Sequence, residues 1–152
     1  MMMNKIFAVA VAGICAGFMS AGAQAAEMET LALVERATTD VVTDTGAAGD
    51  SPGDILTYAN EMFDKDNATK VGDDNGWCVR VVAGKSWECF FTLILADGQI
   101  TVEGPFYDGK DSVMAITGGT GKYVGITGEM KLHARNPEGT EYDFTYGYVL
   151  DD

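Results

Sequence analysis

Two polar side chains interrupt otherwise apolar faces in the first half of the chain, and they are the strongest candidates for chemistry. Alternate residues of a β-strand face the same side, so Glu35 shares a face with two leucines, and Asn60 shares one with a leucine, a tyrosine and a methionine. A carboxylate or an amide on an apolar face is costly unless it is paired, and a carboxylate in a cavity commonly marks a functional site. Glu35 and Asn60 are therefore the candidate catalytic residues. The alternative is that both lie at strand ends, near solvent or a backbone partner.

Two cysteines lie in a predicted hairpin whose register brings them together. β-forming residues flank a turn at Ala83 and Gly84, and a turn centred between these two residues sets Cys78 opposite Cys89. Cross-strand partners have Cβ atoms about 4.5–5.5 Å apart, which is close to the reach of a disulfide. The sequence predicts a Cys78–Cys89 disulfide. If the turn is centred one residue later, the two thiols stay free.

The same register sets Arg80 opposite Trp87 on the face that carries the cysteines. A cation–π contact between these side chains is the ordinary interpretation. The sharper interpretation is that Arg80 lies inside the fold and binds an anionic group. Near the end of the chain, a stripe of alternating aromatic residues includes Phe144 and Tyr146. Such a stripe is typical of core packing, although in a barrel the core and a ligand can share one wall.

Other motifs argue against several kinds of site. His133, the only histidine, alternates with charged residues on a solvent-facing side, which excludes a His-dependent triad and a His-rich zinc site. The glycine-rich run 118–122 lacks the spacing of a phosphate-binding loop and is predicted to be a tight turn. Asp73, Asp74 and Asp108 are most simply solvated loop charges. We expect neither a metal nor an organic cofactor.

Breaks rich in Gly and Asp divide the chain into eight short segments. We predict strands over 28–37, 54–63, 76–83, 86–96, 98–106, 111–118, 126–135 and 140–150. No segment sustains a helical period over three turns, and most connections are short. The pattern predicts an all-β, eight-stranded antiparallel up-and-down barrel, with rim loops at 38–53 and 64–75. The 86–96 strand is apolar on both faces, which predicts that a second subunit or a loop covers its outer side.

Residues 1–25 are predicted to be a signal peptide that is removed on export. Lys5 precedes an apolar run too short to span a membrane, and a small-residue cleavage pattern ends at Ala25. Residues 26–152 then form a single domain in the periplasm or outside the cell. The whole chain has a formal net charge of −13. This acidity excludes nucleic acid as a partner and disfavours binding to anionic membranes.

An ordered series of motifs along the mature chain resembles a known family. The series runs through Gly53-Asp54, Gly76-Trp77-Cys78, Gly104-Pro105-Phe106, the Gly-Gly-Thr-Gly run that begins at Gly118, and Gly128-Glu129-Met130. Together these segments resemble the allene oxide cyclases of plants and, more distantly, the dirigent proteins. The resemblance implies a calycin-like barrel that is commonly trimeric. A homotrimer would explain the apolar outer face of the 86–96 strand.

Allene oxide cyclases close an unstable fatty-acid allene oxide into a cyclopentenone without a cofactor, and the resemblance implies roles for three residues. Glu35 corresponds to a glutamate that stabilises developing positive charge in an apolar cavity. Asn60 corresponds to an asparagine that helps to hold a water on the epoxide oxygen, and Cys78 to a cavity cysteine that helps to fold the substrate. The physical logic is electrostatic stabilisation combined with confinement of one conformer.

The sequence departs from the family pattern at four places. Ala37 replaces a second water-holding asparagine, Thr43-Asp44 do not match a serine–proline pair, Phe106 replaces a tyrosine, and Cys89 replaces a small residue. The water site of the family is therefore only half present in this chain.

We expect a secreted, cofactor-free barrel that binds a small apolar, lipid- or phenolic-like molecule and directs its cyclisation or isomerisation. Glu35 would be the electrostatic residue and Asn60 its polar partner. The expected cavity wall consists of Cys78, Arg80, Phe106, Phe144 and Tyr146. The alternative is a non-catalytic barrel that binds a ligand or has a structural role, including a dirigent-like role beside a separate oxidase. A dry cavity that reaches Glu35 favours chemistry, whereas a filled core favours structure.

Overall fold

The computed structural model describes residues 27–150, and every regular element in that range is a β-strand. The strands are β1 (Glu29–Arg36), β2 (Val41–Thr43), β3 (Ile55–Asp64), β4 (Lys70–Val82), β5 (Ser86–Leu95), β6 (Gly98–Tyr107), β7 (Ser112–Gly121), β8 (Ile126–Ala134) and β9 (Glu141–Leu150). This confirms the all-β class. The signal peptide predicted over 1–25 lies outside the described residues. Within the described range, no helix has the length and apolarity needed to cross a membrane.

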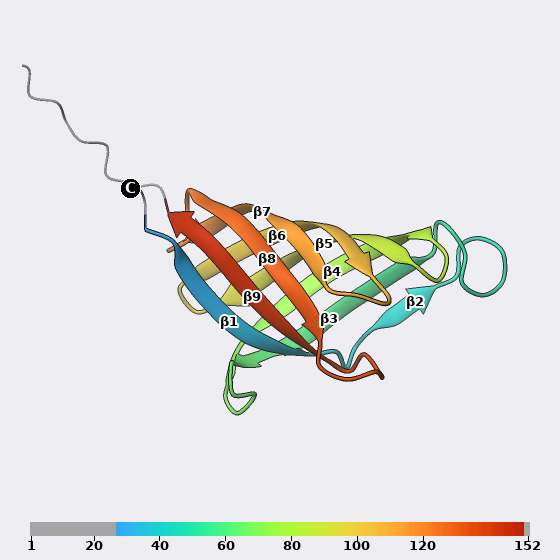
Figure 1. The fold of residues 1–152 in the computed structure, drawn as a ribbon, viewed down its shortest axis with the longest axis horizontal. Coiled ribbons are helices and arrows are strands. Elements are labelled where there is room, and N and C mark those ends of the chain that lie inside the picture. Colours follow the sequence, from blue (N-terminus) through green and yellow to red (C-terminus); the bar gives the residue numbers. More distant parts are fainter. Residues whose placement is uncertain (1–26, 151–152) are drawn as a thin grey trace, which may run out of the picture.

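Eight of the strands close into an antiparallel up-and-down barrel (Figure 1). The strands from β3 to β9 pair in sequence order, β9 pairs with β1, and β1 pairs with the second half of β3. The closing pairs include Glu35 opposite Met62. The predicted eight-stranded barrel is therefore confirmed, and the candidate catalytic glutamate lies on the strand that closes it.

The ninth strand, β2, was not predicted. It pairs with residues 55–57 at the first half of β3, next to the part of β3 that pairs with β1. Figure 1 shows β2 beside β3, leading into the loop that precedes β3. The 38–53 segment is therefore only partly a rim loop, because its first residues extend the barrel wall.

The fourth strand begins at Lys70 rather than at residue 76. Asp and Asn have low β-propensity, and the run Asp73-Asp74-Asn75 therefore gave no strand signal. Pairing with β3 on one side and β5 on the other holds this run in strand conformation. As a result Asp74 lies inside the barrel and is fully buried, so the prediction that it is a solvated loop charge is wrong.

The glycine-rich run that ends at Gly121 is also part of a strand. Residues 118–121 pair with residues 98–101 of β6, and the turn lies after them, at 122–125. The predicted tight turn is therefore displaced toward the C-terminus. Backbone pairing of this glycine-rich segment with β6 replaces the turn that the sequence suggested.

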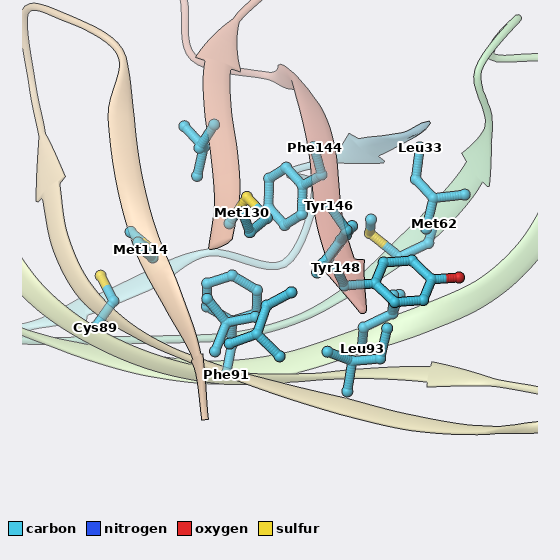
Figure 2. Close-up of a cluster of buried hydrophobic side chains, with 14 of the residues drawn as sticks. Leu33, Met62, Cys89, Phe91, Leu93, Met114, Met130, Phe144, Tyr146 and Tyr148 are labelled. Carbon is cyan, nitrogen blue, oxygen red and sulfur yellow. The ribbon is translucent and has the colours of Figure 1, made fainter. Parts of the chain in front are cut away.

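Apolar side chains fill the middle of the barrel (Figure 2). Phe91, Phe144, Tyr146, Met62 and Met130 are among the side chains with almost no exposure. The rings of Phe91 and Phe144 have centroids 5.5 Å apart. These side chains fill the lumen at mid-height, and open space inside the barrel lies toward the end where β1, β4, β6 and β8 finish.

The outer face of β4 and β5 carries aromatic residues that the described chain leaves uncovered. Trp77 is 47% exposed, and its ring centroid lies 6.3 Å from that of the half-buried Phe90. The covering loop predicted for this face is thus not formed by residues 27–150. A homotrimer that covers it stays a prediction.

The predicted disulfide is present. Cys78 lies directly opposite Cys89 in the β4–β5 hairpin, and the two sulfur atoms are bonded. The bridge joins residues separated by 11 positions. Closing a loop of this length removes conformational entropy from the unfolded chain and stabilises the fold by about 3 kcal/mol.

We expect the double variant Cys78→Ala/Cys89→Ala to unfold at a lower urea concentration, with a loss of about 3 kcal/mol in the free energy of unfolding. The intact mass of the wild type should rise by the mass of two hydrogens when the unfolded protein is reduced. An unchanged mass on reduction would show free thiols and contradict the bridge.

Candidate functional site

A small cavity opens at the barrel end where β1, β4, β6 and β8 finish. Its volume is about 40 Å³, and its wall is mostly aromatic and aliphatic with two carboxyl groups, those of Glu35 and Asp40. Of the residues predicted as wall, Cys78, Phe106 and Phe144 line it. We call this cavity the inner chamber. The other two predicted wall residues lie elsewhere: Arg80 is at the rim and Tyr146 is fully buried in the core.

A wider hollow of about 440 Å³ adjoins the inner chamber. It lies between the β6–β7 and β8–β9 connections, and Phe106, Leu132 and Tyr142 belong to both walls. We call this hollow the vestibule. Ligand pockets usually measure roughly 300–1,000 Å³. The inner chamber alone is much smaller than that, whereas the vestibule is within the range.

Glu35 lies near the end of β1, with a side chain that faces the inner chamber and is only 5% exposed. Its Oε1 accepts a hydrogen bond of 2.8 Å from Asn60 Nδ2. Burial raises the pKa of Glu35 from 4.5 to about 7, and the bond from Asn60 offsets this only in part. Glu35 is therefore close to the balance between acid and anion at neutral pH, which suits charge stabilisation or proton transfer.

The side-chain amide of Asn60 is fully engaged by the protein. Nδ2 donates to Glu35 and to Asp40, at 2.8 Å in each case. Oδ1 accepts from the backbone N–H groups of Thr38 and Thr39 at 3.0 Å, and from the Thr39 hydroxyl at 2.8 Å. An amide has two donor hydrogens and one acceptor oxygen. Asn60 therefore orders the 37–40 turn around Glu35. It has the backbone partners expected by the alternative interpretation, and it also contacts the candidate catalytic carboxyl group.

Asp74 is the site residue that the sequence prediction missed. It is fully buried on β4, opposite Asn60, and its carboxyl is within hydrogen-bonding reach of Glu35. Burial, followed by the charge on Glu35, raises the pKa of Asp74 well above its ordinary value. The sequence contains a sign of this position. Asp74, Gly76 and Cys78 are alternate residues, so in a strand extended back to residue 74 the Asp74 side chain faces the same side as Cys78.

Three tyrosines surround these carboxyl groups. The Tyr58 ring lies over Gly76, its partner on β4, where a Cβ atom would come within 2.6 Å of the phenolic oxygen. Gly76 therefore provides the space for the ring. Burial, and then the nearby carboxyl groups, raises the pKa values of Tyr58 and Tyr146, and that of Tyr142 to about 12. All three phenols are neutral near pH 7.

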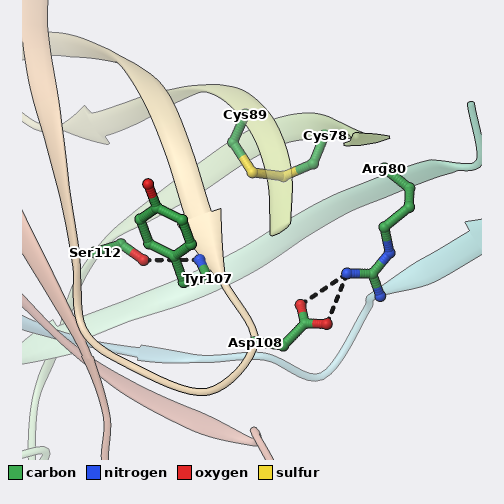
Figure 3. Close-up of a disulfide and its surroundings, with 6 residues drawn as sticks. All are labelled: Cys78, Arg80, Cys89, Tyr107, Asp108 and Ser112. Carbon is green, nitrogen blue, oxygen red and sulfur yellow. Dashed lines mark hydrogen bonds and ion pairs between the residues drawn. A yellow bond between two sulfur atoms is a disulfide. The ribbon is translucent and has the colours of Figure 1, made fainter. Parts of the chain in front are cut away.

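Arg80 is held at the rim by protein groups (Figure 3). Its guanidinium carbon lies 4.0 Å from the centroid of the Trp87 ring, which confirms the ordinary cation–π interpretation. Nη1 donates to both carboxylate oxygens of Asp108, at 2.8 and 2.7 Å, and Nε lies 2.6 Å from a carboxylate oxygen of Asp50. Two carboxylates therefore neutralise Arg80, and Asp108 is its partner rather than a solvated loop charge.

The loop before β3 is fastened by Asp54. This side chain is almost fully buried and accepts hydrogen bonds from the backbone N–H groups of Ser51 at 2.7 Å and Thr45 at 3.1 Å. These bonds to its charged form hold the pKa of Asp54 below its ordinary value. The Gly53-Asp54 motif therefore shapes the open end of the barrel.

The profile described as "Allene oxide cyclase barrel like domain" matches residues 34–144, from the closing strand to the first half of β9. The chain belongs to this family. The resemblance inferred from the motifs is therefore confirmed. In this allene oxide cyclase-like barrel the Cys78 thiol is oxidised in a disulfide, and the Asn60 amide is occupied by protein groups. Among residues 27–150, no set of three or more histidine, cysteine or acidic side chains is arranged to hold a metal ion.

Solved structures with this allene oxide cyclase-like fold carry several chemistries. A pyocyanin demethylase aligns with a TM-score of 0.68 and 24% identity, over 80% of this chain and 100% of its own. A pterocarpan synthase dirigent protein aligns with a TM-score of 0.64 and 12% identity, over 83% and 97%. The Diels Alderase AbmU from Streptomyces koyangensis aligns with a TM-score of 0.66 and 14% identity, over 85% and 71%. At these identities the likeness is one of fold, and function depends on the site.

The burial of Glu35 has a testable effect on stability. Its pKa is about 7 in the folded protein against 4.5 as the ordinary value. The proton on Glu35 therefore favours the folded state: the contribution is fully present below pH 4.5 and is lost as the pH rises through about 7. Compared with Glu35→Gln, which cannot ionise, the wild type should lose about 3 kcal/mol of unfolding free energy over this interval.

Urea denaturation of both proteins between about pH 4 and 8 measures the difference. The matched control is Glu61→Gln on β3, because that side chain is 52% exposed and its variant should follow the wild type. Parallel stability curves for the wild type and Glu35→Gln would contradict the burial of an ionisable Glu35.

Proposed function

We propose that this barrel binds a small apolar, lipid- or phenolic-like molecule at its open end and directs the cyclisation or isomerisation of that molecule without a cofactor. The observation that carries the proposal is the buried carboxyl group of Glu35, which faces a chamber with mostly aromatic and aliphatic walls. In such surroundings the dielectric is low, so a fixed charge acts on a bound molecule more strongly than it would in water.

Glu35 is the proposed catalytic residue. As an anion it stabilises the positive charge that develops on a ligand when a strained or activated bond opens. Asn60 keeps the carboxylate in place through its bond to Oε1. The rings of Phe106 and Phe144 confine the ligand to one conformer, which selects one product among several.

The ligand occupies both spaces in this proposal. The inner chamber, of about 40 Å³, takes only the reacting group, and the vestibule, of about 440 Å³, takes the rest of the molecule. The rings of Phe106 and Tyr142 pack edge to face with centroids 6.0 Å apart at the boundary. Binding moves these two rings apart.

A neutral ligand fits the charges better than an anion. The carboxyl groups of Glu35 and Asp40 face the chamber, the chain has a net charge of −13, and Arg80 is already paired with two carboxylates. A fatty-acid anion would be repelled as it approached, whereas a neutral ester or phenol would not.

Export and assembly are part of the same proposal. The Cys78–Cys89 disulfide supports an oxidising compartment, either the periplasm or the extracellular space. The exposed Trp77 beside Phe90 supports a subunit contact on the outer face of β4 and β5, as in a homotrimer.

A non-catalytic ligand-binding barrel is the second candidate. It is favoured by the oxidised Cys78 thiol and by the engaged Asn60 amide, because neither group is free to act on a substrate as the family resemblance implies. In this role the barrel carries its ligand or, like a dirigent protein, steers a coupling performed by a separate oxidase.

Freshly generated allene oxide, supplied both as the free acid and as the neutral methyl ester, tests the proposal through the chirality of the cyclopentenone. We expect the wild type to give one enantiomer of the ester product in excess. Glu35→Gln should remove that excess, whereas the outer-face control Glu61→Gln should keep it. Racemic product at the spontaneous rate, from wild type that still binds the ester, would contradict catalysis and favour the carrier.

A further inference from the structure

A second carboxyl group lies against Glu35 inside the barrel. Asp74 has no solvent exposure, and within the described part of the chain neither of its carboxylate oxygens has a hydrogen-bond donor. The phenolic oxygen of Tyr146, also fully buried, has no partner there either. Buried polar groups are nearly always paired in folded proteins. Three buried oxygen atoms beside Glu35 therefore have no hydrogen-bond partner among the described residues.

The groups that face this pair carry no positive charge. They are Asn60 and Tyr58 from β3, Asp40 from the 37–40 turn, and Tyr142 and Tyr146 from β9. The neighbour of Asp74 on β5 is Leu93. None of the ion pairs formed within residues 27–150 includes Glu35 or Asp74. Two carboxyl groups in contact, buried and without a cation, cannot both ionise near neutral pH.

The hydrogen bonds decide which member of the pair ionises. Glu35 accepts the N–H of Asn60 at 2.8 Å, and such a bond stabilises the charged form. Asp74 receives no donor from the described residues and is the more deeply buried of the two. The anion therefore belongs on Glu35 and the proton on Asp74, whose O–H can then donate to the carboxylate of Glu35 within its reach.

We propose that Asp74 is held as a neutral acid and that, by donating its O–H to Glu35, it fixes the one negative charge of this pair on Glu35, at the wall of the inner chamber. Asp74 is thus a positioning residue, and this role rests on the function proposed for Glu35. The pair suits substrates on which one positive charge develops beside the chamber wall. When the pH falls and Glu35 also takes up a proton, the pair loses its negative charge.

Infrared spectroscopy of the mature protein, without any ligand, detects a neutral carboxyl group directly. At about pH 8.5 ordinary carboxyl groups, with pKa values near 4, are ionised. We expect the wild type to keep one neutral-acid carbonyl band there and Asp74→Asn to lack it. The matched control is Asp73→Asn, the next residue, whose side chain is 51% exposed on the outer face and whose variant should keep the band. A folded wild type without the band, or a band that persists in Asp74→Asn, overturns the proposal.

The titration of Glu35 in the Asp74 variants gives a second measurement. Asn is neutral and can donate to Glu35, so Asp74→Asn should leave the pKa of Glu35 within about half a unit of the wild type, whereas Asp74→Leu removes the donor and should raise it by about one or more. If Asp74 were ionised, Asp74→Asn would instead remove a negative neighbour and lower the pKa of Glu35 by about one or more, which overturns the proposal.

Neither measurement uses a ligand, so their outcome is independent of the catalytic proposal. If the barrel gives racemic product but keeps the neutral-acid band, the function proposed for Glu35 fails and the state proposed for Asp74 stands. If Asp74→Leu does not fold, the wild-type spectrum and the Asp74→Asn titration still decide the matter.

Discussion

The burial of one carboxyl group where the barrel closes is the constraint on which the rest of the site depends. An ionised Glu35 without compensation would cost several kcal/mol in such surroundings. The amide of Asn60 offsets part of that cost, and it also binds the 37–40 turn at which β1 leaves the barrel. The Asn60 side chain therefore connects three parts of the structure: the β1–β3 pairing that closes the barrel, the 37–40 turn at its rim, and the carboxyl group of Glu35. A change that loosens one of the three would loosen the others.

The remaining strong polar contacts of the open end lie outside the inner chamber. Arg80 stacks on Trp87 and pairs with Asp108 at the rim, and Asp54 fastens the loop before β3. The disulfide adds a rigid, apolar piece of wall. This separation keeps charge at the rim and leaves the chamber mostly apolar around its carboxyl groups, which is the setting in which a single charge has the greatest effect.

Strand alternation was enough to predict the parts of the site that lie in regular, well-patterned strands. Glu35 and Asn60 stood out on apolar faces, and one hairpin register gave both the Cys78–Cys89 bridge and the contact of Arg80 with its tryptophan. Asp74 was missed because its neighbours have low β-propensity and become a strand only through pairing on both sides. The position of Asp40 depends on a turn that is ordered by a long-range contact with Asn60, and no local pattern encodes such a contact.

Glu35 is a buried carboxyl group close to the balance between acid and anion, beside a mostly apolar chamber. The most direct test is to follow the side-chain carboxyl carbon of Glu35 by NMR as the pH changes in the ligand-free protein, with the signal assigned by its loss in Glu35→Gln. We expect a midpoint of about 7, well above the ordinary 4.5. A midpoint near 4.5 would show that water reaches Glu35 freely and that its carboxyl group is not buried beside the chamber.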